Sequence, residues 1–179
     1  MLEGKRIAIG VTGGIAAYKA AELTSRLKKR GCEVRIVMSE NATKFIQPLT
    51  LETLSGSRAY VDQFAREFEM DHIGIARWAD AFVVAPATFN FIGKMAAGIA
   101  DDLVTTTAAA VTCPVLLAPA MNARMWKNAA CRENIKTLRA CGVITVGPES
   151  GLLACGDDDV GRMSEPAGIV EAIEAIEIE

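Results

Sequence analysis

Residues 6–31 read RIAIGVTGGIAAYKAAELTSRLKKRG, and they contain a short β-rich run, a glycine-rich turn and a helical segment in that order. The run at 6–11 is almost continuously apolar, which is typical of a strand that is covered on both faces of a sheet. The helical segment repeats apolar residues at helical spacing and stops at Gly31. This strand–turn–helix unit predicts an α/β fold with parallel strands.

Further units of the same kind follow along the chain. Strands are predicted at 33–39, 79–88, 114–121 and 143–147, and helical segments at 42–56, twice within 91–112 and at 129–142. The segment 165–179 is predicted to be a closing helix or the start of a connection to a further domain. Near-continuous apolar strands alternating with helices indicate a doubly wound, Rossmann-like parallel sheet. A chain of 179 residues has about the size of one domain with one core, so we expect a single domain over 1–179.

Composition argues against several classes of protein. The net charge of −3 gives no electrostatic footprint for a nucleic acid. No apolar run approaches the roughly 20 residues that span a bilayer, and the start lacks a hydrophobic signal, so we expect a cytoplasmic protein without a membrane partner. Five cysteines without a C-x-x-C pair suggest reduced thiols, with neither a disulfide framework nor a metal site.

Ligands of doubly wound sheets bind beyond the carboxyl ends of the strands, so the segments there are candidates for function. The first is the turn with Gly10, Gly13 and Gly14, whose backbone amides either receive a phosphate or only pack tightly. The turn matches neither G-x-G-x-x-G nor the G-K-[ST] ending of a P-loop. It therefore argues against the standard dinucleotide and ATP sites.

Three further segments carry polar side chains. Thr88 and Asn90 follow a strand and are both natural helix N-cap residues. Asn122 follows the next strand, where its amide would bind a carboxylate or tie down its own loop. His72, the only histidine, lies in a segment that we interpret as a loop. Lone histidines are mostly structural, but an imidazole also suits a general base near neutral pH.

The segment LLACGDDDVGRM, residues 152–163, sets a cysteine beside three aspartates. A core strand would not tolerate this acidic run, and glycines on both sides permit the backbone to hinge. We therefore predict a flap over about 151–163 that closes over a bound ligand. Asp157, Asp158 and Asp159 either favour the protonated form of the Cys155 thiol or simply face water.

Together these segments resemble a known family. GVTGGIAAYK, HIGIARWAD, APATFNFIGKMAAGIADDL, PAMNARMW and ACGDDDVGRM occur in the order and spacing of the flavin-dependent cysteine decarboxylases. The resemblance runs from about residue 5 to residue 168 and is closest to the phosphopantothenoylcysteine decarboxylases. It implies bound FMN and a carboxy-lyase that converts 4′-phosphopantothenoylcysteine to 4′-phosphopantetheine in coenzyme A synthesis.

The resemblance also assigns roles to residues. FMN would be held by Gly13, Gly14, Ile15, Ser39, Thr88, Phe89, Asn90, Phe91 and Ala120. His72 would be the catalytic base, Cys155 the proton donor, and Asn122 the ligand of the substrate carboxylate, with Ala154, Arg162 and Met163 as further substrate contacts. Oxidation of the thiol-bearing carbon makes loss of carbon dioxide possible, and the enethiolate that remains is then reduced and protonated.

The same resemblance implies an assembly. Members of the family form homotrimers, often four trimers to a dodecamer, and the decarboxylase is often fused to a phosphopantothenoylcysteine synthetase domain. Asp159 stands where the flap of the family usually has a glycine, which questions the closed geometry of the flap here.

Three alternatives share features of this chain. A flavin prenyltransferase has the same fold but lacks the flap motif. A peptidyl-cysteine decarboxylase stops at the enethiol, so it needs no donor cysteine. A regulatory flavoprotein would lack His72 or Cys155, and both are present.

Overall fold

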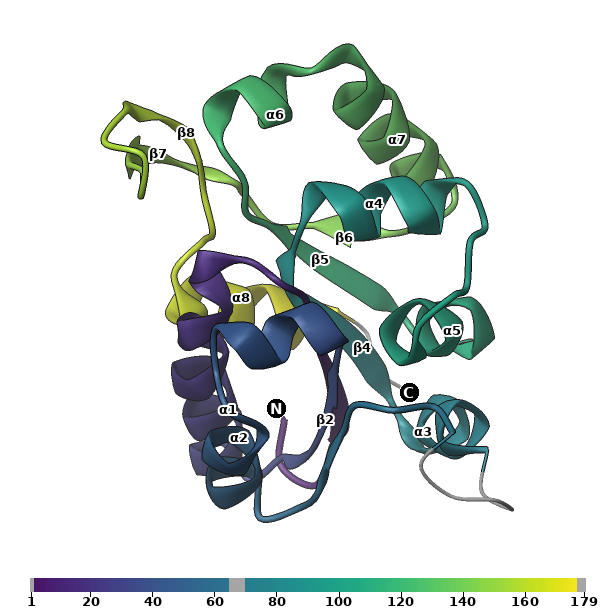
Figure 1. Ribbon diagram of the computed structural model, residues 1–179. Coiled ribbons are helices and arrows are strands. Elements are labelled where there is room, and N and C mark those ends of the chain that lie inside the picture. The colour runs from purple at the N-terminus through teal and green to yellow at the C-terminus, as the bar shows by residue number, and fades with distance from the viewer. Residues whose placement is uncertain (1, 65–69, 177–179) are drawn as a thin grey trace.

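The computed structural model describes residues 2–64 and 70–176, and it shows a parallel sheet with helices on both faces (Figure 1). The strands are β1 (Arg6–Val11), β2 (Glu33–Met38), β3 (Ala59–Tyr60), β4 (Ala81–Ala87), β5 (Val115–Pro119) and β6 (Ile144–Thr145). They lie in the order β3-β2-β1-β4-β5-β6, and every neighbouring pair is parallel. The predicted doubly wound α/β fold is confirmed.

The helices form two layers. Helix α1 (Lys19–Lys29) packs against α2 (Pro48–Ser55) and α8 (Pro166–Glu174), while α3 (Asp71–Trp78) packs against α5 (Leu103–Ala110), and α4 (Phe89–Ala96) against α7 (Ala129–Ala140). The remaining pieces are α6 (Ala123–Lys127) and two short 3-10 helices, η1 (Ile15–Tyr18) and η2 (Glu40–Lys44). None of the helices in the described ranges is long and apolar enough to cross a membrane.

Each face of the sheet has its own core because the strands alternate their side chains between the two helix layers. On β1, Ile7 and Ile9 are buried with α1 and α8, whereas Ala8 belongs to the cluster that contains Phe82 and the α4 side chains. Burial on both faces explains why these strands are almost continuously apolar in the sequence.

The chain order places a crevice at the centre of the sheet. From β1 the chain adds β2 and then β3 on one side, whereas β4, β5 and β6 extend the other side. Strands β1 and β4 therefore flank the point where the strand order reverses. In open α/β sheets, ligands bind at the carboxyl ends of such strands.

A separate antiparallel hairpin projects from the sheet beside α6 (Figure 1). Its strands are β7 (Glu149–Leu152) and β8 (Asp158–Arg162), and the turn between them carries Cys155. The predicted flap at 151–163 corresponds closely to this hairpin. Asp157 and Asp158 are exposed, so the acidic run forms an edge strand outside the core.

Two sequence interpretations need correction. His72 does not lie in a loop but in the first turn of α3, and this helix precedes β4 instead of following a strand end. Gly74 in the middle of α3 weakens the helical signal of the sequence, because glycine disfavours a helix interior. The two-residue strand β3 was not predicted at all, and residues 177–179 of the predicted last helix lie outside the described residues.

Candidate active site

A cavity of about 910 Å³ opens at the carboxyl ends of the central strands. Its volume lies within the range of small-molecule and cofactor sites. Every predicted cofactor or substrate residue lines it, namely Gly13, Gly14, Ile15, Ser39, Thr88, Phe89, Asn90, Phe91, Ala120, Asn122, Ala154, Cys155, Arg162 and Met163. The predicted base, His72, does not. One cavity therefore unites segments that lie up to 150 positions apart in the sequence.

The glycine turn forms a floor without side chains. A Cβ atom on Gly13 would lie 2.5 Å from Asn41 Cβ, and one on Gly14 would lie 3.2 Å from Thr88 Cγ2. Residues with side chains would therefore push η2 or the start of α4 away from the turn. The structure supplies a packing reason for Gly13, while its role in phosphate binding stays a prediction.

Thr12 and Thr88 join the ends of β1 and β4. The buried Thr12 hydroxyl donates to the carbonyl of Pro86 at 2.7 Å, and the backbone N–H of Thr88 donates to Thr12 Oγ1 at 3.1 Å. Thr88 Oγ1 accepts from the N–H of Phe91 and so caps α4, as its residue type predicted. These bonds fix the mouth of α4 against the glycine turn.

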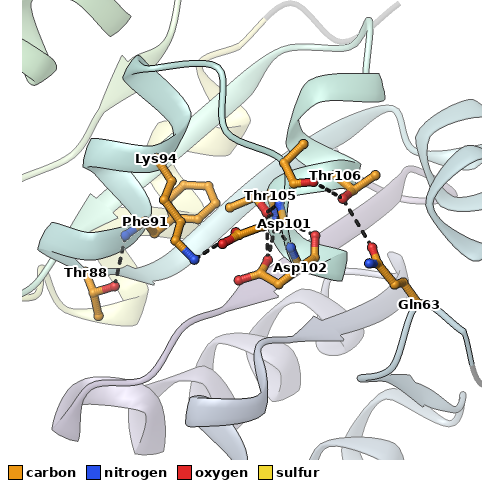
Figure 2. A network of polar contacts seen from close by, with 9 residues as sticks. Gln63, Thr88, Phe91, Lys94, Asp101, Asp102, Thr105 and Thr106 are labelled. Carbon is orange, nitrogen blue, oxygen red and sulfur yellow. Dashed lines mark hydrogen bonds and ion pairs between the residues drawn. The ribbon is translucent and has the colours of Figure 1, made fainter.

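A polar network continues from α4 to α5 (Figure 2). Lys94 Nζ lies 2.8 Å from Asp101 Oδ1, and this contact lowers the pKa of Asp101. Asp102 and Thr105 form a reciprocal capping box at the start of α5. Lys94 and Asp102 both line the cavity, so this wall is polar. The positive charge of Lys94 is balanced by its ion pair with Asp101.

Asn122 and Cys155 meet over the cavity, although 33 positions separate them. The side-chain oxygen of Asn122 accepts from the N–H of Arg124 at 2.8 Å and caps α6. Its Nδ2 donates to Cys155 Sγ at 3.1 Å, and the Cys155 thiol lies 3.4 Å from Asp157 Oδ2. The amide oxygen therefore ties down its own loop, while the amide N–H groups point toward the thiol.

The hairpin is joined to the segment that carries Asn122. The N–H of Met121 donates to the carbonyl of Gly161 at 3.0 Å, and a side chain on Gly161 would collide with the Met121 carbonyl oxygen. Lys127 Nζ bonds Asp159 Oδ2 at 2.5 Å and lowers the pKa of that carboxyl. Asp159 is thus accommodated by pairing with α6, whereas Asp157 is the aspartate that contacts the Cys155 thiol.

His72 lies apart from these groups. In Figure 1, α3 is far from the hairpin. Its first turn is held by Asp71, a buried carboxylate that pairs with Arg58 at 2.9 Å. His72 Nδ1 is buried without a hydrogen-bond partner among the described residues. One copy of the chain therefore does not bring His72 to Asn122 and Cys155.

Comparison with known proteins identifies the family. A family model described as Flavoprotein matches residues 1–176. The chain belongs to the Flavoprotein family. This membership confirms the resemblance seen in the motifs, and it agrees with a cavity at the switch point of the sheet.

Relatives within the Flavoprotein family include longer proteins. The chain is 49% identical over 176 residues to the coenzyme A biosynthesis bifunctional protein CoaBC of Vibrio vulnificus. The aligned region covers 97% of this chain and 44% of that protein. The chain thus spans less than half the length of this relative.

Solved structures of flavoproteins share the architecture. A PPC decarboxylase mutant complexed with pantothenoylaminoethenethiol superposes with a TM-score of 0.85 at 29% identity, over 96% of this chain and 97% of that one. The FMN-dependent cysteine decarboxylase SpaF gives a TM-score of 0.85 at 31% identity, with 96% of both chains covered.

Sequence reasoning missed several cavity residues of this flavoprotein. Thr12, Tyr18 and Lys19 line the cavity, yet none was singled out. Lys19 carried a signal, because it is a charged residue within the apolar stretch IAAYKAAEL. A lysine in such a position is buried only when it has partners.

Proposed function

We propose that this chain catalyses the FMN-dependent decarboxylation of 4′-phosphopantothenoylcysteine to 4′-phosphopantetheine, a step of coenzyme A biosynthesis. The observation that carries the proposal is the contact of 3.1 Å between the Asn122 amide and the Cys155 thiol at the cavity. This contact places the neutral Asn122 amide, which would bind the substrate carboxylate, beside the Cys155 thiol, which would donate the proton. The names of the bifunctional relative and of the PPC decarboxylase support the same substrate.

The cavity suits FMN as the cofactor. Its volume and its aromatic residues Phe89, Phe91 and Tyr18 suit a flat ring system, and the glycine floor leaves room for a phosphate on backbone amides. In the proposal, Gly13, Gly14, Ile15 and Ser39 hold the phosphate end, while residues 88–91 and Ala120 line the remainder. When bound, FMN supplies a reversible acceptor of two electrons for the thiol-bearing carbon of the substrate.

The side chains of the chain then handle the carboxylate and a proton. The Nδ2 group of Asn122 orients the substrate carboxylate without adding a positive charge that would retain it. Cys155 holds a proton on Sγ and delivers it to the substrate carbon at the end of the cycle. Ala154, Arg162 and Met163 close the cavity from the hairpin side and exclude water.

A base role for His72 requires a second copy of the chain. Because His72 lies outside the cavity, the proposed homo-oligomer, a trimer or dodecamer, would bring His72 of one copy to the cavity of another. Since Nδ1 is buried, Nε2 is the nitrogen that would accept the substrate proton. The proposal thus includes a shared active site.

The relatives also bear on the rest of the protein. In the proposal, residues 1–179 form one decarboxylase domain of a cytoplasmic enzyme, and this domain is either free or fused to a synthetase domain in a longer protein, as the bifunctional relative is longer than this chain. A mass measurement of the native protein separates a fused protein from a free domain.

Purified protein is expected to be yellow and to release FMN, not FAD, on heating or acid treatment. The glycine floor offers one phosphate site, and no G-x-G-x-x-G fingerprint accompanies it. Absorbance and chromatography of the released flavin check this result. A colourless protein that takes up no added FMN contradicts the cofactor assignment.

Turnover of 4′-phosphopantothenoylcysteine tests the function itself. Under anaerobic conditions we expect release of carbon dioxide and formation of 4′-phosphopantetheine. Mass spectrometry detects the product. A peptide with a carboxy-terminal cysteine is the control substrate, and preferential turnover of that peptide would assign the chain to the peptidyl-cysteine decarboxylases. Prenylation of the flavin with no decarboxylation would instead identify a flavin prenyltransferase.

A further inference from the structure

Lys19 is a buried charge in the cavity wall that the proposed mechanism does not use. It is the first residue of α1 and directly follows η1, which continues from the glycine turn. Only 7% of its side chain is exposed. Lysine is almost never buried to this degree unless its charge is paired, so its partners indicate its role.

Both partners lie where the hairpin leaves the cavity. Lys19 Nζ donates to the carbonyl oxygen of Met163 and to Glu165 Oε1, each at 3.0 Å. Met163 directly follows β8, and Glu165 is the residue before α8. Bonding to Lys19 lowers the pKa of Glu165. One amine thus links the glycine turn to the base of the hairpin.

The same contacts extend to both hairpin strands. Glu165 Oε1 lies 3.3 Å from Arg162 Nη2, and that nitrogen lies 3.6 Å from Glu149 Oε2. The N–H of Glu165 also donates to Glu149 Oε1 at 3.3 Å. We call these residues, Lys19, Glu149, Arg162 and Glu165, the hinge network. It joins β7, β8, α1 and the start of α8.

The balance of charge argues against direct ligand binding by Lys19. Glu165 matches its positive charge, so the lysine offers little net attraction to an anion in the cavity. Its two hydrogen bonds instead fix the backbone at the point from which the hairpin extends. Among the four members, Lys19 is the one with the least exposed side chain, and its burial protects these bonds from screening by salt.

We propose that Lys19 is a positioning residue that holds the base of the hairpin against the glycine turn, so that Cys155 stays beside Asn122 before substrate binds. This inference rests on the proposed function, because it concerns the flap of the same site. Without Lys19 the hairpin samples other positions, and substrate must order it on binding.

Hydrogen exchange of the FMN-loaded protein tests the inference. Lys19→Met keeps an unbranched apolar stem but removes the charge and its donors. Backbone amides of residues 149–163 are expected to exchange about tenfold faster or more, the scale of a lost hydrogen bond to a charged group. The matched control is Lys127→Met, which breaks an ion pair of the same hairpin whose lysine side chain is 52% exposed. Exposed pairs contribute little, so its exchange should change less than about threefold.

Kinetics separate positioning from a merely structural role. In Lys19→Met we expect KM for 4′-phosphopantothenoylcysteine to rise about tenfold while kcat stays within about threefold, because bound substrate restores the order of the hairpin. A merely structural role would lower FMN content and kcat at unchanged KM. Glu165→Gln keeps the Met163 bond and should shift exchange and KM in the same direction by less.

The outcomes are distinguishable from a failure of the proposed function. Faster hairpin exchange in a protein that turns over no substrate would support the hinge network and reject the decarboxylase. Unchanged exchange and KM in FMN-loaded Lys19→Met overturns the positioning role. If Lys19→Met does not fold, Glu165→Gln decides, and unchanged hairpin exchange in that variant overturns the proposal as well.

Discussion

Cys155→Ser is expected to stop the reaction after about one turnover per flavin, because a serine hydroxyl is a far weaker acid than a thiol. Asn122 and the glycine floor are untouched, so oxidation and loss of carbon dioxide should still proceed. The flavin absorbance should remain bleached. Mass spectrometry should show an unsaturated thiol that is lighter than 4′-phosphopantetheine by about two hydrogen atoms, because the final reduction of the enethiolate does not take place.

Cys141→Ser is the matched control for this experiment. Cys141 is an exposed cysteine that does not line the site cavity, so its removal should leave full turnover. Complete formation of 4′-phosphopantetheine by Cys155→Ser would mean that the hairpin is only a lid and that another group supplies the proton.

The His72→Asn protein is expected to remain yellow. The rate at which substrate bleaches its flavin under anaerobic conditions should fall about a hundredfold or more, the usual effect of removing a general base. Cofactor binding should survive, because the substitution changes none of the residues that line the cavity within one chain and that are proposed to hold FMN. Stopped-flow absorbance measures the rate of bleaching. Near-normal bleaching would show that the only histidine has a structural role.

Mixed assemblies test whether the base comes from a second copy. Co-expression of equal amounts of His72→Asn and Cys155→Ser chains should restore activity, because some cavities then combine an intact Cys155 with an intact His72. If each site uses one residue from each of two neighbours, random mixing leaves about a quarter of the sites complete. No recovery in assemblies that are shown to be mixed would contradict a shared site.

The regular parts of the fold were predictable because their signals are local. The bounds of β1 were predicted to the residue, since its apolar run lies between the basic pair Lys5 and Arg6 and the glycine turn. The helix predicted from residue 15 divides into η1 and α1, a difference that periodicity does not resolve. Strand β3 was missed because its two residues pair with β2 only through the tertiary fold.

The candidate site was predictable in part of its membership but not in its contacts. Motifs located many of the residues that line the cavity, whereas the bond between Asn122 and Cys155 depends on how the hairpin folds back onto α6. The pairing of Lys19 with Glu165 joins residues 146 positions apart, and no local pattern encodes it. The separation of His72 from the cavity follows only from the position of α3.

The contact between Gly161 and Met121 limits which substitutions the hairpin can accept. A mutation that gives residue 161 even a methyl group would push β8 away from the segment that presents Asn122, and no flexible side chain is there to absorb the shift. Asp157 and Asp158, at the exposed end of the same hairpin, meet no such limit. Mutations can therefore change the charge of the exposed tip of the hairpin, while residue 161 at its base stays glycine.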